Sequence, residues 1–448
     1  MRITSDSAVK FLAIILSISL CMGLAPLLDI ANANGAVAQS DVPKDAIHIQ
    51  TATQLAAIGG EDSEGKYYVL DNDINLEDEW VPIEDFRGTF DGQGHSINNL
   101  YVLKSSNRQY AGLFGQTTGT ITINNVIVNI NYDGLAATRA VGGLIGLSGP
   151  VFVVNSCVTG DIIVSGSSVD VGGLIGLSGN ASINNSYTTG NIVAEASHGS
   201  AHAGGLIGLS STAVVVNSYA SGDVTALSSS QISYPACAGG LIGYSMFGVN
   251  VERSYASGKI TATDVSSLSL GDFVCAGGLV GYSGYGNVVV ENSYATGSIL
   301  ATASRHGACA GGLIGYVWIG DAAVENSYTI SDIITSGHHA YAGDLVGYND
   351  GGVSATGCYS LSTQKLIGDT INAAGKSLTP KEMKTKESFV DWDFETIWAI
   401  NPNINEGYPY FRTSNTWNLG SFWFIALLVV VVLLTMGIAY VLLKKRFR

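Results

Sequence analysis

The sequence predicts an all-β chain: a right-handed parallel β-helix (a solenoid) with a cap at each end, followed by one C-terminal transmembrane helix. Three observations predict this fold. The pattern Gly-Gly-Leu-(Ile/Val)-Gly, or a close variant, occurs seven times, each time followed by Asn-Ser-Tyr-x-x-Gly or a relative of it. The intervening runs are rich in valine and isoleucine, and glycine, 56 of 448 residues, would weaken the helices of an α-helical repeat. Residues 421–443 form an uncharged apolar run long enough to cross a bilayer.

The repeat period indicates one coil of the β-helix per unit. The units align on Leu144, Leu174, Leu206, Leu241, Leu279, Leu313 and Leu345, with a weaker first copy at Leu113, and the steps are 31, 30, 32, 35, 38, 34 and 32 residues. The distance from each leucine to the following Tyr position is only 13 to 15 residues, so most insertions fall after it, at one corner of the coil. We expect three short strands per unit: Gly-Gly-Leu-Ile-Gly, Val-Val-Val-Asn-Ser-Tyr and Gly-Asp-Val-Thr-Ala.

Composition and spacing divide the chain into consecutive segments. Before the repeats, short segments in which apolar and polar residues alternate are separated by glycine turns. After the repeats, the bulky side chains of Trp392, Trp398 and Tyr408–Phe411 are suited to closing a core. We also expect a short amphipathic helix over residues 379–387. The predicted segments are a signal peptide (1–38), an N-terminal cap with the first coils (39–103), the repeat β-helix (104–360), a C-terminal cap (361–412), a short linker (413–420), the transmembrane helix (421–443) and a cytoplasmic basic tail (444–448).

The two ends of the chain predict its location. Residues 1–38 combine two basic residues, an apolar run and the small-residue site Ala36-Val37-Ala38, as a secretory signal peptide does. Four basic residues follow the apolar run at the C-terminus, which places that end in the cytoplasm by the positive-inside rule. The expected product is a single-pass protein of the cell membrane with its repeats outside the cell.

In a β-helix, equivalent residues of successive coils stack in a row. One such row is asparagine in most units, and it is interrupted by Arg253. Asparagine tolerates the left-handed backbone conformation of a tight bend, and stacked side-chain amides can bond to one another. We expect a structural ladder formed by Asn155, Asn185, Asn217, Asn292 and Asn326.

Two tyrosine rows follow from the same alignment. The row that begins at Tyr187 and Tyr219 is expected mainly to pack in the core. A second row changes from leucine to tyrosine halfway along the array, which indicates a partly exposed position. The resulting candidate binding strip consists of Tyr244, Tyr282, Tyr316 and Tyr348.

Glutamates form a fourth row, which adds the candidate binding residues Glu252, Glu291 and Glu325 just before the asparagine bend. Stacked like charges repel, so these carboxylates are expected to point into solvent or to share a cation. The sequence therefore leaves calcium binding open and predicts no other cofactor.

Cysteines form a fifth row, in which Cys237, Cys275 and Cys309 follow His202. Ligands in a single file do not converge on one point as tetrahedral metal coordination requires, so we expect buried thiols that pack as small hydrophobic groups and no metal site. Five cysteines follow the signal region, an odd number that cannot all pair within the chain: Cys157, Cys237, Cys275, Cys309 and Cys358.

The paired motifs resemble the GLUG motif, a short repeat of bacterial and archaeal surface proteins that also occurs in the non-catalytic part of some immunoglobulin A peptidases. The resemblance covers roughly residues 47 to 412. It implies a parallel β-helix with a surface, adhesion-like role. It carries no catalytic residue over to this chain.

No catalytic motif is found in the sequence. None of the seven histidines is followed by glutamate, so the His-Glu-x-x-His signature of zinc peptidases is absent. Parallel β-helices also include pectin-lyase-like polysaccharide lyases and hydrolases, and the neighbouring carboxylates of Glu291 and Glu325 keep that alternative open. A structural role in the cell envelope is a further alternative. The favoured hypothesis is non-catalytic adhesion or ligand binding.

Charge limits the partners. The formal net charge is −15. Removing the signal peptide (net zero) and the four basic residues of the tail leaves −15 − 4 = −19 for the predicted extracellular part. Such a surface repels nucleic acid, so the expected partners are the membrane and an extracellular glycan or protein.

Overall fold

The computed structural model describes residues 42–104, 107–229, 236–265, 273–369 and 374–412. The predicted signal peptide, linker, transmembrane helix and basic tail lie outside these residues. Within the part of the chain that is described, no helix is both long and apolar enough to span a membrane. The described residues belong to two compact units, one ending at Trp392 and one beginning at Asp393.

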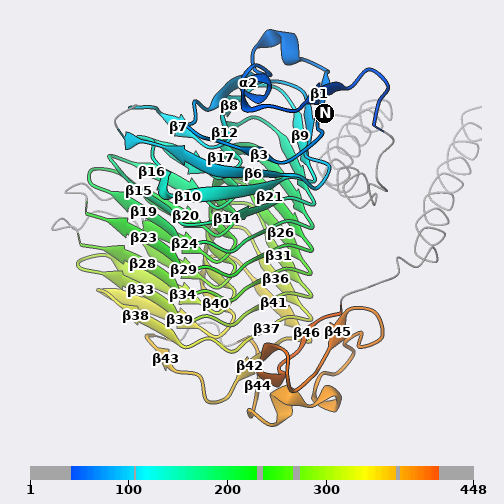
Figure 1. The fold of residues 1–448 in the computed structure, drawn as a ribbon. Helices are drawn as coiled ribbons and strands as arrows, with labels where there is room; N and C mark the ends of the chain where they lie inside the picture. The colour runs from blue at the N-terminus through cyan, green and yellow to red at the C-terminus, as the bar shows by residue number, and fades with distance from the viewer. Residues whose placement is uncertain (1–41, 105–106, 230–235, 266–272, 370–373, 413–448) are drawn as a thin grey trace, which may run out of the picture. The chain divides into compact units, whose positions relative to one another are not determined.

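The first unit is a parallel β-solenoid of about eight repeat coils, which confirms the predicted all-β fold. Its coils lie one above another in Figure 1, and the strands of successive coils pair in parallel to form four long sheets with 18, 11, 8 and 7 strands. We call these sheets A, B, C and D in that order. In the repeat coils, the chain runs through sheets C, A, B and D in turn.

Sheet C contains β7 (Tyr110–Ala111), β11 (Ala140–Gly142), β16 (Val169–Gly172), β20 (Ala201–Gly204), β24 (Ala236–Gly239), β29 (Val274–Gly277), β34 (Gly307–Gly311) and β39 (His339–Gly343). Sheet D contains β15 (Ile162–Gly166), β19 (Ile192–Ala196), β23 (Val224–Ser228), β28 (Ile260–Asp264), β33 (Ile299–Ala303), β38 (Ile333–Ser336) and β43 (Leu366–Ile367).

Sheet A contains β1 (Ile47–Ile49), β2 (Tyr67–Leu70), β4 (Ile83–Phe86), β5 (Thr89–Asp91), β8 (Phe114–Thr117), β9 (Ile121–Asn124), β12 (Ile145–Ser148), β13 (Val151–Val154), β17 (Ile175–Asn184), β21 (Ile207–Val216), β25 (Ile242–Ser245), β26 (Val249–Glu252), β30 (Val280–Tyr285), β31 (Val288–Glu291), β35 (Ile314–Ile319), β36 (Ala322–Glu325), β40 (Val346–Asn349) and β41 (Val353–Thr356).

Sheet B contains β3 (Ile74–Asn75), β6 (Ser96–Val102), β10 (Ile127–Leu135), β14 (Cys157–Thr159), β18 (Tyr187–Thr188), β22 (Tyr219–Ala220), β27 (Tyr255–Ala256), β32 (Tyr294–Ala295), β37 (Tyr328–Thr329), β42 (Tyr359–Leu361) and β44 (Lys376–Leu378).

The expectation of three strands per unit was wrong, because each repeat coil has four sides. In one unit, Gly204 ends β20 and Ile207 begins β21, so the predicted strand Gly-Gly-Leu-Ile-Gly spans a corner. A Cβ atom at Gly205 would collide with the carbonyl oxygen of Gly240 in the next coil. Glycine is therefore required at this corner, because any side chain would prevent the close approach of the two neighbouring coils. The predicted second strand is likewise interrupted, at Asn217 and Ser218.

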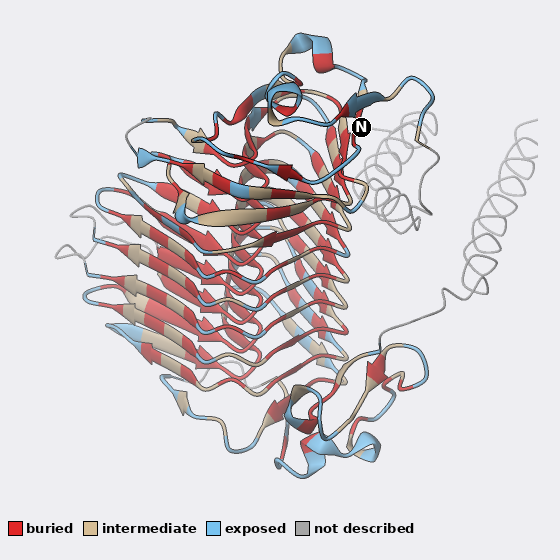
Figure 2. Cartoon of the chain, viewed as in Figure 1, coloured by how far each residue is buried: buried red, intermediate tan, exposed pale blue. Residues whose placement is uncertain are grey.

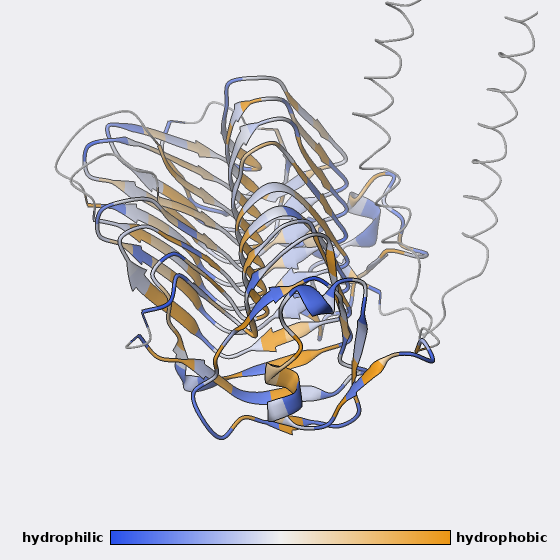
Figure 3. Cartoon of the chain, turned by 90° about the horizontal axis from the view of Figure 1, so that it is seen from above, coloured by the Kyte–Doolittle hydropathy of each residue, from blue (hydrophilic) through white to orange (hydrophobic). Residues whose placement is uncertain are grey.

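The core is a column of small and branched apolar side chains inside the coils. Buried positions alternate along the strands (Figure 2), and apolar stretches line up from coil to coil when the coils are seen from above (Figure 3). In β23 the inward residues are Val224, Ala226 and Ser228, whereas Thr225 and Leu227 are half-buried. Because inward and outward residues alternate, a shift of one residue in strand pairing would move the apolar side chains out of the core, so the register is retained from coil to coil.

The Asn-Ser-Tyr corner connects the coils through side chains as well as through strands. Asn185 and Asn217 both have φ of 49°, the left-handed conformation that turns the chain between sheets A and B. The next residue is a buried serine. The Ser218 hydroxyl donates to the Val216 carbonyl oxygen (2.7 Å) and accepts the Ser186 backbone N–H of the preceding coil (3.1 Å). The same pair of bonds recurs at Ser156, Ser186, Ser254, Ser293 and Ser327.

Most variation in coil length falls between sheets D and C, as the repeat spacing predicts. The connection comprises residues 167–168 after β15 and residues 265–273 after β28. His306 lies in this connection after β33. Its imidazole is buried, and Nε2 lies 3.3 Å from an Asp264 carboxylate oxygen.

The N-terminal end of the first unit carries a short helix, α2 (Ala52–Ala56). A reciprocal capping box between Thr51 and Gln54 begins this helix, and Leu55 is fully buried. A 3₁₀ turn, η1 (Glu61–Ser63), follows it. Near the other end, residues 379–387 do not form the expected amphipathic helix. They contain the 3₁₀ turn η3 (Glu382–Lys384) and the start of η4 (Lys386–Ser388), because the extended backbone of Thr385 (φ −122°, ψ 117°) separates the two turns.

The second unit has its own small core. Strands β45 (Trp398–Ala399) and β46 (Tyr410–Phe411) form an antiparallel pair, with the 3₁₀ turn η5 (Asn405–Gly407) between them. Trp398 packs against Phe411, with ring centroids 4.8 Å apart. The Arg412 guanidinium donates to the carbonyl oxygens of Phe394 and Trp398.

The serine corner predicts a stability effect. Ser218→Ala leaves the buried N–H of Ser186 without its acceptor, so the free energy of unfolding should fall by about 1–3 kcal/mol. Urea denaturation followed by circular dichroism measures this change. Ser221→Ala, at an exposed serine of the same coil, is the control and should change the free energy by less than about 0.5 kcal/mol. Equal effects of the two variants would contradict the role given to the corner hydroxyl.

Candidate functional site

The predicted binding strip of tyrosines packs against the cysteine row. The rings project from β25, β30, β35 and β40 and contact thiols that project from sheet C, forming a hydrophobic cluster separate from the main core. The five cysteines of the described residues are all buried. The cluster contains Cys237, Cys275, Cys309 and Tyr316, with Tyr244, Phe273, Tyr282, Tyr341 and Tyr348 packed against it.

Burial differs along this strip. Tyr316 is only 6% exposed, its hydroxyl donates to Asp350 (2.8 Å), and its ring stands edge-on to Tyr282 at 5.2 Å. Burial raises the pKa values of Tyr282 and Tyr316. Tyr316 therefore has little surface to offer a ligand, and ligand binding by the half-buried Tyr244, Tyr282 and Tyr348 stays a prediction.

The glutamate row lies on β26, β31 and β36, with Glu252, Glu291 and Glu325 in register. Burial, and then the charges of Glu252 and Glu325, raise the pKa of Glu291. Two neighbours offset part of this repulsion: Arg253 Nε lies 3.2 Å from Glu252, and the Asn292 amide donates to Glu291 (3.1 Å). Among the described residues, no group of three or more histidine, cysteine or acidic side chains is arranged to hold a metal ion.

Asp170 and His202 occupy the same row of sheet C as the cysteines, in earlier coils. The His202 Nδ1 atom lies 2.6 Å from the Asp170 carboxylate, the imidazole is buried, and its Nε2 has no hydrogen-bond partner. These residues line a cavity of about 450 Å³ with Arg139, several serines and Leu209. The ring of Tyr244 packs against His202 at 4.8 Å, so the cavity lies beside the start of the tyrosine–cysteine cluster.

The other tyrosine row lies on the outer face of sheet B, so the expectation of core packing was wrong for its first members. The Thr188 hydroxyl is buried and donates to the Gly205 carbonyl oxygen (2.7 Å) inside the coil. Adjacent residues of a strand point to opposite faces, so Tyr187 points outward. The rings of Tyr187, Tyr219 and Tyr255 stack face to face, with centroids 4.7 and 4.8 Å apart and interplanar angles of 1° and 7°.

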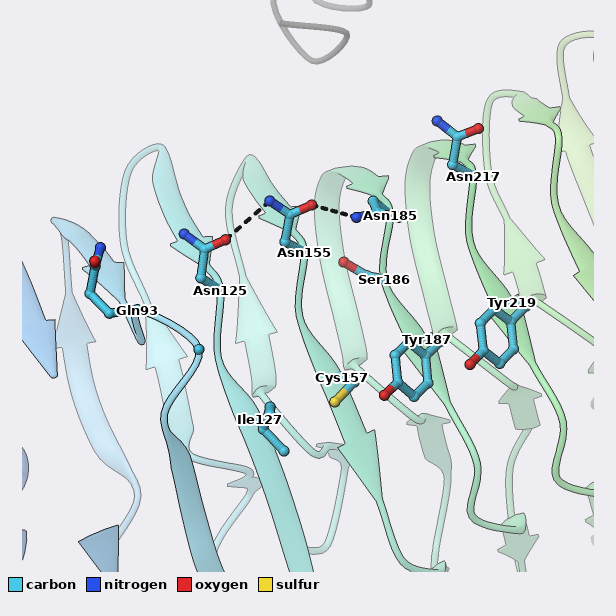
Figure 4. Close-up of a pocket in the computed structure, with 11 residues that line it drawn as sticks. Gln93, Asn125, Ile127, Asn155, Cys157, Asn185, Ser186, Tyr187, Asn217 and Tyr219 are labelled. Atoms are coloured by element: carbon cyan, nitrogen blue, oxygen red, sulfur yellow. Dashed lines mark hydrogen bonds between the residues drawn. The ribbon is translucent and has the colours of Figure 1, made fainter. Parts of the chain in front are cut away.

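A groove of about 590 Å³ runs between this tyrosine row and the asparagine row (Figure 4). Asn185 donates to Asn155 (2.6 Å), and Asn155 donates to Asn125 (3.0 Å). Asn125 donates in turn to the buried carboxylate of Asp91 (3.0 Å). The remaining asparagines of the predicted ladder, Asn217, Asn292 and Asn326, share the left-handed backbone, while Asn292 bonds to Glu291 instead.

A ridge of exposed aromatic side chains was not predicted. It consists of Phe247, Tyr285 and Trp318, which are 57%, 47% and 40% exposed, flanked by Met246 and Ile319. We call this set the aromatic ridge. The ring centroids lie 6.4 Å apart for Phe247 and Tyr285 and 5.0 Å apart for Tyr285 and Trp318.

Extra residues within sheet A create the ridge. β21 runs unbroken from Ile207 to Val216, whereas the following coils divide the same path into two strands, such as β30 and β31. Each break on the ridge contains a glycine of positive φ: Gly248 (141°), Gly286 (114°) and Gly320 (144°). The signal was present in the sequence, because the leucine-to-tyrosine distance lengthens from 13 residues to 14 and 15 in these units.

No family model and no curated protein matches the chain. The solved structures that are similar to this chain include two proteins named as proteases. One is a candidate immunoglobulin A1 protease from Bacteroides ovatus, with 19% identity and a TM-score of 0.36 over 83% of this chain and 93% of that one. The other is named IgA1 protease, with 15% identity and a TM-score of 0.45, and the match covers 78% of this chain but only 24% of that protein. At these scores neither likeness carries an argument about function.

The raised pKa of Glu291 predicts a pH-dependent stability change. A carboxyl group whose pKa is raised by folding binds its proton more tightly in the folded state, so it lowers stability once the pH exceeds its unfolded pKa. Glu291→Gln removes this penalty and keeps an oxygen for Asn292. We expect the free energy of unfolding to rise by about 0.5 kcal/mol at about pH 7, the size of a charge pair at a protein surface.

Urea denaturation at about pH 7 and at about pH 3 tests this prediction, since a glutamate carboxyl group is mostly protonated in both states at the lower pH. The effect of Glu291→Gln should vanish there. A loss of stability at about pH 7 would instead show that the carboxylate row stabilises the fold.

Proposed function

We propose that this chain is a non-catalytic, membrane-anchored cell-surface protein that binds an extracellular glycan or protein through its β-solenoid. The aromatic ridge is the observation that carries the proposal. The largest apolar patch that a soluble protein exposes is often a functional site. Tryptophan and tyrosine are also enriched among the residues that contribute most to binding.

The geometry of the ridge suits recognition. Its rings are inclined by 35° and 56° to one another, unlike the nearly parallel rings of the stack that begins at Tyr187. Inclined, half-exposed rings keep part of their faces open to a ligand, whereas each ring in a parallel stack covers the faces of its neighbours. The strands on both sides of each glycine break fix the positions of these rings before any ligand arrives, which lowers the entropic cost of binding.

The area of the ridge limits its ligand. An aromatic side chain contributes about 150–250 Å² when fully buried, so three half-exposed rings offer on the order of 300 Å². A stable protein interface buries about 800 Å² on each partner. The ridge alone is therefore sufficient for a small ligand such as an oligosaccharide, and a protein partner would need additional contacts on the neighbouring strands.

Removing two rings should abolish most binding. For Tyr285→Ala with Trp318→Ala we expect affinity for the ligand to fall about thirtyfold, equivalent to about 2 kcal/mol. The ligand is first identified by testing the purified protein against arrays of glycans and cell-surface polymers, with and without calcium. Its affinity for the variants is then measured by surface plasmon resonance.

Tyr132→Ala is the matched control, because Tyr132 on β10 is 95% exposed and lies outside the ridge. It should bind as the unmodified protein does. Equal binding by the ridge variant and the Tyr132 variant would contradict the proposal, as would the absence of any ligand on all arrays.

A further inference from the structure

The groove between the asparagine and tyrosine rows has unused hydrogen-bonding capacity along its length. A side-chain amide has two N–H donors and an oxygen with two lone pairs. In the ladder, Asn155 uses one N–H toward Asn125 and one lone pair toward Asn185. One donor and one acceptor of this amide remain, and Figure 4 shows the asparagine side chains along one side of the groove.

On the side opposite the asparagines the groove is lined by Ile127, Cys157, Tyr187 and Tyr219, and the two tyrosines offer ring edges and hydroxyl groups. Because the rings of Tyr187 and Tyr219 lie parallel at 4.7 Å, each covers a face of the other. A sugar ring therefore cannot stack flat on an aromatic face between these two rings. A side-chain hydrogen bond with Cys157 raises the pKa of Tyr187 to about 12, so the Tyr187 hydroxyl stays protonated at neutral pH.

The spacing of these groups limits the ligand further. The two tyrosines that line the groove, Tyr187 and Tyr219, lie in successive coils with ring centroids 4.7 Å apart, so equivalent groups repeat at about this interval along the groove. This repeat is close to the length of one sugar ring in an extended chain. An extended peptide advances only about 3.3 Å per residue, so successive residues would fall out of register with successive coils.

Charge disfavours an acidic polymer. The whole chain has a formal net charge of −15, and the buried Asp91 carboxylate ends the amide ladder beside the groove. Nucleic acids and strongly anionic polysaccharides would be repelled. Neutral sugar hydroxyls can both donate to and accept from the amide and phenol groups.

We infer that this groove binds a neutral linear polysaccharide lying parallel to the solenoid axis, with successive sugar units in register with successive coils. The inference rests on the proposed ligand-binding function but uses a surface separate from the aromatic ridge. The groove is lined by coils that begin at Gln93 and end at Tyr219, whereas the ridge begins at Met246.

The test uses the purified full chain and neutral β-1,4-linked oligosaccharides of glucose and of N-acetylglucosamine, from the monosaccharide to the hexasaccharide. Isothermal titration calorimetry measures their affinities. Affinity for one of the two series should increase with each added sugar until the groove is filled and then remain constant. Affinity that does not depend on length, or no binding of either series, would overturn the inference.

Variants that lack tyrosine hydroxyl groups test whether the groove is the surface that binds the oligosaccharide. Tyr187→Phe with Tyr219→Phe keeps the ring stack but removes two hydroxyl groups, so affinity for the hexasaccharide should fall about tenfold. Tyr255→Phe, in the same stack but outside the groove lining, should leave affinity unchanged. Equal affinity of the double variant and the Tyr255 variant would overturn the assignment.

The ridge variant separates the two proposals. If Tyr285→Ala with Trp318→Ala retains length-dependent binding of the oligosaccharides and the groove variant loses it, the inference holds even if the ridge has no ligand. If only the ridge variant loses binding, the groove inference fails and the proposed function stands.

Discussion

Turn-to-turn hydrogen bonding at the Asn-Ser-Tyr corner is the constraint on which the other features of the solenoid depend. Strand pairing alone leaves the chain free to turn at different places in different coils. Here the left-handed asparagine sets the bend, and the serine hydroxyl that follows accepts a backbone N–H from the preceding coil. Because the bond repeats coil after coil, the bend stays at the same place along sheets A and B.

The outer surfaces follow from this repetition. A repeated tyrosine after the corner becomes a parallel stack, and a repeated asparagine becomes a row of amides, so a groove forms between them. Where the sequence departs from strict repetition, the surface changes. One or two additional residues bring Phe247, Tyr285 and Trp318 to the outside, and the row that holds Asp170 and His202 becomes cysteine in later coils.

Repetition also explains what the sequence could predict. The period, the parallel pairing of coils and the corner with variable length were all predicted, because each appears in every unit. The alignment could not give the direction of a side chain near a corner. Tyr187 and Thr188 are adjacent, and only the structure shows that Thr188 points inward. The buried pair of His306 and Asp264 was missed for a related reason, because it occurs once and joins two different coils.

Hydrogen–deuterium exchange of the corner amides tests this account most directly. The backbone N–H groups of Ser156, Ser186, Ser218, Ser254 and Ser293 donate to the serine hydroxyl of the next coil. If the corner is an integral part of the stack, these amides should exchange as slowly as those of the strands beside them, at a rate set by cooperative opening of the coils. Exchange as fast as that of the exposed connections between sheets D and C would contradict the account.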